Sequence, residues 1–282
     1  MAKQERGIGG VAARETWIPP AARSLQVDEP ESLRRLKAAM APVQFKVAIT
    51  GTERGAGVST VAVNLALALA RADRDGHAGA VQKKPQMGIL HLGVAPKPAL
   101  DPAGMKVLSL ETLLGGPLAL QTGVSTDWRV VQESLTRVDW KGIDFLLVEL
   151  PFGIGIVGDF SELFPAMDAA CIVTLPTEGA RDRIRRAWKF FDASSIPVIG
   201  LVSNMEGRFK GEEVEDLGQT FGIPLRVGLP HEPALATIQA GAAPYILANR
   251  EAKVSRAFFD LADDLVDYLF WLRDEGDQEE EF

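Results

Sequence analysis

The chain contains very little cysteine: its 282 residues include one, Cys171. A single thiol excludes an internal disulfide, and it excludes any metal or iron–sulfur site held by the cysteines of one chain alone. Long apolar runs are also missing, since no stretch reaches the roughly 20 residues that cross a membrane. The N-terminal stretch lacks the apolar core of a secretory signal. We therefore expect a cytoplasmic protein without a membrane segment.

Positive charge is scarce as well. Thirty Lys and Arg residues stand against 38 Asp and Glu, which gives a net charge of -8. An acidic surface repels nucleic acid and anionic lipid, so neither nucleic acid nor a membrane is expected as a partner. The three histidines, His77, His91 and His231, lie too far apart in the sequence for a local metal-binding motif. We accordingly predict no metal ligands and no catalytic residues.

From Phe45 onward, short apolar segments alternate with helical ones. Strands are expected at 45–50, 78–81, 106–110, 145–149, 170–175, 198–203 and 225–228, and helices at 31–40, 60–72, 127–138, 180–193, 212–221, 233–240 and 253–273. Several of these strands lack period-two alternation, which is typical of strands buried on both faces. The pattern predicts an α/β fold, a doubly wound and mainly parallel sheet with helices on both faces, as in P-loop NTPases.

The expected organisation has three parts. Residues 1–43 form an N-terminal arm that ends in a short helix, and residues 44–273 form the α/β domain. Residues 274–282 are an acidic tail, which its composition predicts to be disordered. The last helix is apolar around more than one face at 268–272. Two interpretations follow: this helix packs on the sheet, or Phe270 and Trp271 lie in an interface with a protein partner.

A glycine-rich turn joins the first strand to an alanine-rich helix. The turn and the helix start read Gly51-Thr52-Glu53-Arg54-Gly55-Ala56-Gly57-Val58-Ser59-Thr60. A strand, a glycine-rich turn, Ser or Thr and a helix together are the context of a phosphate-binding loop. Its backbone N–H groups and the positive end of the helix can hold an anion, and Ser59 or Thr60 can meet Mg²⁺. The alternative is a plain turn with a capping serine.

Over about residues 44–271 the chain resembles the Mrp/ApbC branch of the MinD/ParA-like P-loop ATPases. Gly57-Val58-Ser59-Thr60 and the helix after it look like the family's loop, and 139–151 looks like its Walker B segment. Residues 196–205 are similar to the strand that carries its base-contacting asparagine, here Asn204. The resemblance implies ATP or ADP with Mg²⁺ as the ligand. The cofactor-binding residues it implies are Arg54, Gly55, Ala56, Gly57, Val58, Ser59, Thr60 and Asn204.

The chain also departs from the family at charged positions. Glu53 and Val58 stand where the family loop has its two lysines, and Glu149 stands at the Walker B aspartate. The segment compared with the family's Asp-containing segment, 80–84, has no carboxylate, and the family's cysteine pair is absent from 206–210. Phosphoryl transfer depends on positioning and on charge stabilisation. We therefore expect no efficient ATP hydrolysis, and nucleotide binding stays open.

Three functions agree with these features. The primary prediction is a non-hydrolytic relative, a pseudo-ATPase that acts through protein partners as a subunit or assembly factor. The first alternative is a nucleotide-dependent iron–sulfur cluster carrier or assembly ATPase. The second alternative is a MinD/ParA-like positioning switch. The resemblance implies assembly as a homodimer or as a heterodimer with an intact paralogue.

Overall fold

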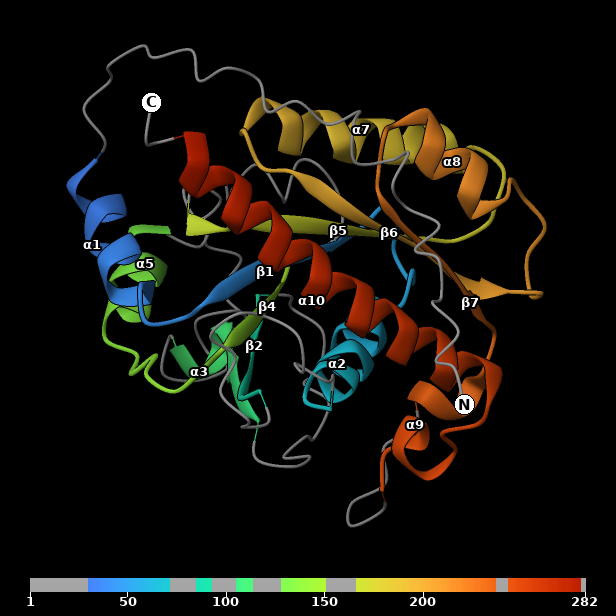
Figure 1. Cartoon of the computed structure of the whole chain (residues 1–282), viewed down its shortest axis with the longest axis horizontal. Coiled ribbons are helices and arrows are strands. Elements are labelled where there is room, and N and C mark those ends of the chain that lie inside the picture. Colours follow the sequence, from blue (N-terminus) through green and yellow to red (C-terminus); the bar gives the residue numbers. More distant parts are fainter. Residues whose placement is uncertain are drawn as a thin grey trace, which may run out of the picture.

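The computed structural model describes residues 30–71, 85–92, 105–113, 128–150, 166–236 and 243–279. Seven strands in these ranges form one sheet in the order β3-β2-β4-β1-β5-β6-β7, and each neighbouring pair is parallel (Figure 1). The strands are β1 (Phe45–Gly51), β2 (Met87–His91), β3 (Lys106–Ser109), β4 (Phe145–Glu149), β5 (Ala169–Thr174), β6 (Val198–Glu206) and β7 (Leu225–Pro230). This sheet confirms the predicted fold class.

Helices cover both faces of the sheet, and each face has its own hydrophobic cluster. One cluster includes side chains of α2 (Val58–Leu69), α9 (Tyr245–Ala248) and α10 (Lys253–Glu279). The other includes side chains of α1 (Glu31–Met40), α3 (Leu110–Leu113), α5 (Trp128–Thr136), α7 (Ala180–Ala193) and α8 (Val214–Thr220). In β5, Cys171 belongs to the first cluster and Ile172 to the second. Burial on both faces explains why such strands show no polar alternation.

The second strand lies elsewhere than the sequence indicated. It was expected at 78–81, which lies outside the described residues, and the structure has it at Met87–His91. This segment is a weak strand signal because it contains Gly88 and ends in His91. The glycine is needed, since a Cβ at Gly88 would lie 2.9 Å from the Leu146 side chain on β4. The helix expected from 233 is a short 3-10 turn, η3 (Pro233–Ala236), in its described part.

Helix α10 runs across the sheet and belongs to the core (Figure 1). Phe270 is 6% exposed, and its ring centroid lies 5.1 Å from that of Phe45. Arg273 covers the same ring, with its guanidinium carbon 4.8 Å from the centroid. The interpretation as a packed helix is therefore confirmed for Phe270. The helix also continues to Glu279, beyond the end expected for it at residue 273. None of the described helices is long and apolar enough to cross a bilayer.

Candidate nucleotide-binding site

The glycine-rich loop lies at the carboxyl end of β1, the central strand, and leads directly into α2. Gly55 and Gly57 have φ angles of +80° and +85°, which residues with a side chain rarely adopt. Gly57 is the N-cap of α2. The first N–H groups of a helix have no acceptor within the helix, so those of Val58, Ser59 and Thr60 are available to an anion. The predicted loop is thus formed.

Asn204, near the end of β6, lies against this loop. Its Nδ2 donates to the carbonyl oxygen of Ala56 at 2.8 Å, and its Oδ1 accepts the N–H of Met205 at 2.9 Å. A Cβ at Gly57 would overlap the Nδ2 atom. Met205 has a φ of +62°, a conformation that costs free energy and is often found at functional sites. The structure brings Asn204 to the loop, while its contact with a nucleotide base stays a prediction.

Three polar side chains meet beneath the first turn of α2. Ser59 Oγ donates to Glu149 Oε1, and His91 Nδ1 lies 2.7 Å from Glu149 Oε2. Glu149 ends β4 and His91 ends β2, where the two residues are register partners. His91 is 4% exposed and Glu149 is 6% exposed. Hydroxyl and carboxylate oxygens are ligands that Mg²⁺ prefers, so Ser59 and Glu149 suit the magnesium ion of a bound nucleotide.

Sequence reasoning missed His91, which it treated as an isolated histidine. The available signal was its position at the end of an apolar segment, because the carboxyl ends of parallel strands meet at one edge of the sheet. Placing the second strand at 78–81 hid that signal. The same error put the comparison with the family's Asp-containing segment at 80–84, whereas β2 ends at His91. The group at this strand end is therefore an imidazole that contacts the Glu149 carboxylate.

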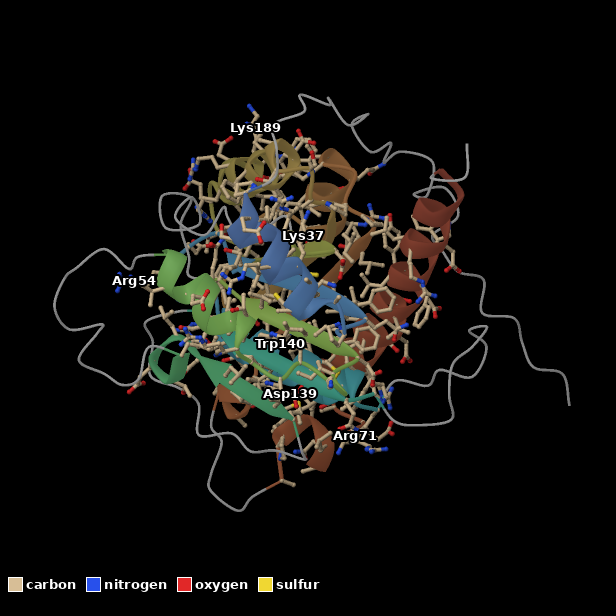
Figure 2. The ribbon with its side chains drawn as sticks, turned by 90° about the vertical axis from the view of Figure 1, so that its left-hand side faces the viewer. Lys37, Arg54, Arg71, Asp139, Trp140 and Lys189 are labelled. Atoms are coloured by element: carbon tan, nitrogen blue, oxygen red, sulfur yellow. The ribbon has the colours of Figure 1, made fainter. Side chains whose placement is uncertain are left out.

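The Glu53 carboxylate also contacts groups outside the loop. Its Oε1 accepts the N–H of Leu175 at 3.1 Å, and its Oε2 lies 3.2 Å from Arg183 Nη2 on α7. The Arg183 guanidinium therefore offsets part of the negative charge that Glu53 brings to a lysine position of the family loop. Val58 packs partly against the core, and Arg54 is exposed at the outer edge of the described fold (Figure 2). The cation that forms an ion pair with Glu53 at 3.2 Å is Arg183 on α7.

The remaining chemical candidates lie away from this cluster. The main-chain N–H of His231, an exposed residue, donates to the carbonyl oxygen of Glu206. His77 lies outside the described residues. Within the described ranges, no group of three or more His, Cys, Asp and Glu side chains could hold a metal ion. Cys171 is 2% exposed on β5, and burial raises the pKa of its thiol to about 12. A thiol that stays protonated is a poor metal ligand and a poor nucleophile.

Replacing Gly200 by alanine should test the structural role of Cys171. A Cβ at Gly200 on β6 would lie 2.6 Å from Cys171 Sγ. We expect Gly200→Ala to lower the free energy of unfolding by about 1–3 kcal/mol, as overpacking does in other cores. Adding Cys171→Ala removes the sulfur and should recover most of that loss. Urea denaturation measures both variants, and equal stability of Gly200→Ala and the wild type would contradict the packing.

The fold and the site define the class of the protein. A central parallel strand, a left-handed glycine turn, a helix start with Ser59, and Glu149 beneath it form a P-loop NTPase-like site. A family model described as "ParA: NUBPL iron-transfer P-loop NTPase" matches residues 42–266. The chain belongs to this family. The resemblance to MinD/ParA-like P-loop ATPases seen in the sequence is thereby confirmed.

Individual relatives agree with this assignment. An iron–sulfur cluster carrier protein of Saccharolobus solfataricus is 24% identical over 80% of this chain and 84% of its own length. The chloroplastic Fe-S cluster assembly factor HCF101 of Arabidopsis thaliana is 26% identical over 91% of this chain, which spans 52% of that protein. The septum site-determining protein MinD of Pyrococcus horikoshii, solved with Mg-ADP, aligns with a TM-score of 0.53 and 18% identity over 78% of this chain and 95% of its own.

These findings correct the primary functional prediction. The sequence analysis favoured a pseudo-ATPase that acts through protein partners, on the ground that the loop has lost both lysines and that 80–84 has no carboxylate. The matched family is one of iron-transfer NTPases, and two relatives are named as a cluster carrier and a cluster assembly factor. The primary prediction was therefore wrong, and the findings favour its first alternative.

Proposed function

We propose that this protein binds a nucleotide with Mg²⁺ in its loop and acts in the assembly or transfer of iron–sulfur clusters. The contact between Ser59 and Glu149 beneath the loop carries the nucleotide part, because it joins two oxygen ligands at the head of α2. Family membership supports the iron–sulfur part. The fold likeness to a MinD structure that holds Mg-ADP supports ADP or ATP as the nucleotide.

Binding would use the backbone more than side-chain charge. The N–H groups of Gly55 and of residues 57–60 would donate to phosphate oxygens, assisted by the positive end of α2, while the Ala56 N–H stays bonded to the carbonyl oxygen of Glu53. Mg²⁺ would take the Ser59 hydroxyl and the Glu149 carboxylate in place of their mutual hydrogen bond. Breaking that bond to a carboxylate costs about 1.5–3 kcal/mol, which the attraction between the carboxylate and a divalent cation would offset. His91 would keep the carboxylate oriented through its contact at 2.7 Å.

The cluster itself would be cargo that is held largely by another protein. Cys171 is the one cysteine of this sequence, and its buried thiol with a pKa of about 12 does not fit a cluster ligand. Even a homodimer would contribute two thiols, where a cluster usually takes four. A protein partner that supplies cysteines is therefore part of the proposal, and a heterodimer with an intact paralogue is one such arrangement. The cytoplasmic location stays a prediction.

Reconstitution should show that the isolated chain does not hold a cluster. Protein incubated with iron and sulfide without oxygen should contain no stoichiometric cluster after desalting, because its thiol is buried and protonated. Iron analysis and the visible absorption spectrum measure this. Cys171→Ala is the matched control and should behave identically. A 4Fe–4S spectrum that vanishes in Cys171→Ala would show that the thiol does bind the cargo.

Cluster transfer tests the proposed function as a whole. A donor protein loaded with a cluster and a recipient apoprotein are mixed with the wild-type chain, and the recipient's cluster-dependent activity is followed over time. We expect the chain to accelerate loading only when Mg²⁺ and ATP are present. Ser59→Ala should lose that acceleration because it removes an oxygen ligand for Mg²⁺. Loading rates that are the same with and without the wild-type chain would count against the proposal.

A further inference from the structure

We infer that Arg183 on α7 is the cation that contacts the phosphate groups of the bound nucleotide. This inference rests on the proposed nucleotide site and assigns it a residue outside the loop. The loop itself has Glu53 and Val58 where the related loops carry lysines. The loop's own cation, Arg54, is exposed, whereas the side chain of Arg183 is 19% exposed and adjoins Glu53. The position of Arg183 supplies the missing charge.

Contacts along the edge of the sheet bring Arg183 to the loop. The first turn of the loop is bonded to the carboxyl end of β5: the N–H of Thr52 donates to the carbonyl oxygen of Val173 at 2.9 Å, and the N–H of Leu175 donates to Glu53 at 3.1 Å. Helix α7 follows that end of β5, and Arg183 lies in its first turn. Its Nη2 atom lies 3.2 Å from Glu53 Oε2, so the guanidinium adjoins the loop.

The guanidinium has donors left for a ligand. Nη1 donates to the carbonyl oxygen of Glu178 at 2.9 Å, and Nη2 donates to Thr177 Oγ1 at 2.5 Å besides facing Glu53. Arginine offers five N–H donors, so these contacts do not exhaust it. Its Nε is buried and has no hydrogen-bond partner among the described residues. A buried donor without an acceptor is unfavourable, and a phosphate oxygen reaching this group after a small loop movement would satisfy it.

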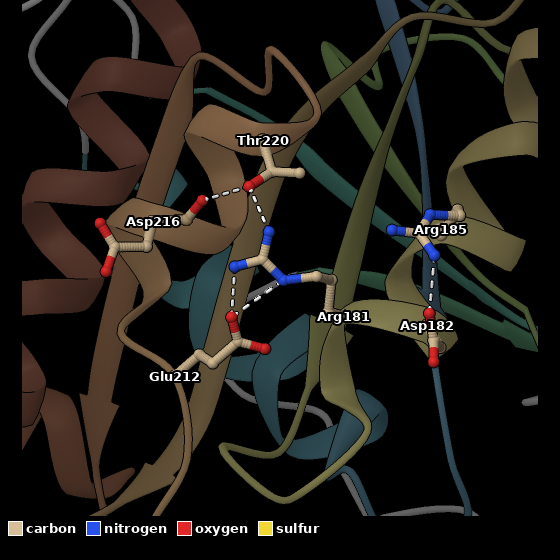
Figure 3. A network of polar contacts seen from close by, with 6 residues as sticks. All are labelled: Arg181, Asp182, Arg185, Glu212, Asp216 and Thr220. Carbon is tan, nitrogen blue, oxygen red and sulfur yellow. Dashed lines mark hydrogen bonds and ion pairs between the residues drawn. The ribbon is translucent and has the colours of Figure 1, made fainter.

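Two neighbouring arginines on α7, Arg181 and Arg185, pair with residues outside the loop (Figure 3). Arg181 donates to Glu212 and to Thr220, which ties α7 to α8. Arg185 pairs with Asp182 on its own helix at 2.7 Å. The side chain of Arg183 is 19% exposed, whereas that of Arg185 is 45% exposed. Arg185 therefore serves as a matched control: it has the same chemistry on the same helix, with no contact to the loop in the structure.

Calorimetric titration with Mg-ADP tests the inference. We expect Arg183→Met to weaken binding by about tenfold or more, because a charge-assisted hydrogen bond to phosphate is lost. Arg185→Met should bind like the wild type. Glu53→Gln should tighten binding in the presence of Arg183, since the guanidinium is no longer shared with a carboxylate. In the Arg183→Met background the same Glu53→Gln change should have a much smaller effect.

The outcomes separate this inference from the proposed function. If the wild type binds Mg-ADP and Arg183→Met binds equally well, the inference is overturned and the nucleotide site stands. Equal tightening by Glu53→Gln in both backgrounds would also overturn it, because the effect would then be simple repulsion. If the wild type does not bind Mg-ADP, both fail. Should thermal unfolding show that Arg183→Met does not fold, Arg183→Gln, which keeps a neutral donor, is expected to show the same loss.

Discussion

A chain that ends at Asp267 should not fold. The truncation removes Leu269 and Phe270, which are 1% and 6% exposed in the cluster between α10 and the sheet. It also removes Phe270 as a partner of Phe45 at the start of β1 and leaves the contact of Phe45 with Phe145. Deleting a single buried Leu or Phe side chain costs about 2–5 kcal/mol, and whole domains have roughly 5–15 kcal/mol of stability. Removing both side chains and the helix turn that carries them should therefore lower the free energy of unfolding to near zero.

Circular dichroism with a urea titration measures this effect. A chain that ends at Asp274 is the control, because it keeps Phe270 and also keeps Arg273, which covers the rings of Phe45 and Phe270. That control should unfold at nearly the wild-type urea concentration. If the chain ending at Asp267 shows the wild-type unfolding midpoint, the end of α10 is not part of the core, and its apolar residues would again be available to a partner.

Gly57→Ala should abolish nucleotide binding and destabilise the domain. The φ of +85° costs a residue with a side chain about 1–3 kcal/mol. The new Cβ would also overlap Asn204 Nδ2 and so break the contact that holds Ala56. Because the N–H groups of the loop must point at one anion, a displaced turn should lower the affinity for Mg-ADP below detection. Calorimetry and urea denaturation of the same preparation measure the two effects.

Gly55→Ala separates backbone strain from the overlap with Asn204. Gly55 has a similar φ of +80°, yet a Cβ there would meet nothing within 4 Å. This variant should lose only the conformational part of the stability, and it should retain more affinity for Mg-ADP than Gly57→Ala. Identical behaviour of the two variants would mean that the close packing of Gly57 on Asn204 does not matter for the loop.

Local patterns in the sequence predicted the parts of the site that are close in the chain. The loop from Gly55 to Thr60 was predicted from its glycine spacing, its serine and the alanine-rich helix after it. Its backbone geometry depends on residues that are neighbours in the sequence. The match around Asn204 placed that residue on a strand, and the structure has it on β6 in contact with Ala56 of the loop. The strand that ends at His91 was not predicted. Its glycine, Gly88, weakens the strand pattern and is there because the Leu146 side chain on β4 leaves no room for a Cβ.

Pairs that are distant in the sequence could not be predicted. Glu53 was interpreted by its charge alone, but its carboxylate pairs with Arg183. The two residues are far apart in the sequence and meet because β1 and β5 are neighbours in the sheet. From the sequence, the aromatic end of α10 was expected to have more apolar side chains than one face could bury. In the structure Phe45 and Arg273 both contact the Phe270 ring, and the helical periodicity of the sequence does not predict these contacts. The functional error had a different origin: the prediction gave more weight to the lysines lost from one loop than to the similarity along residues 42–266.

Titration of the full chain with Mg-ADP tests the central claim, that the loop binds a nucleotide with Mg²⁺, most directly. Isothermal calorimetry should show saturable binding at one site per chain, and that binding should require Mg²⁺. Ser59→Ala should weaken it strongly, because we propose Ser59 and Glu149, which contact each other at the head of α2, as the oxygen ligands of Mg²⁺. The absence of any binding heat at millimolar Mg-ADP, together with an unchanged thermal midpoint, would contradict the account.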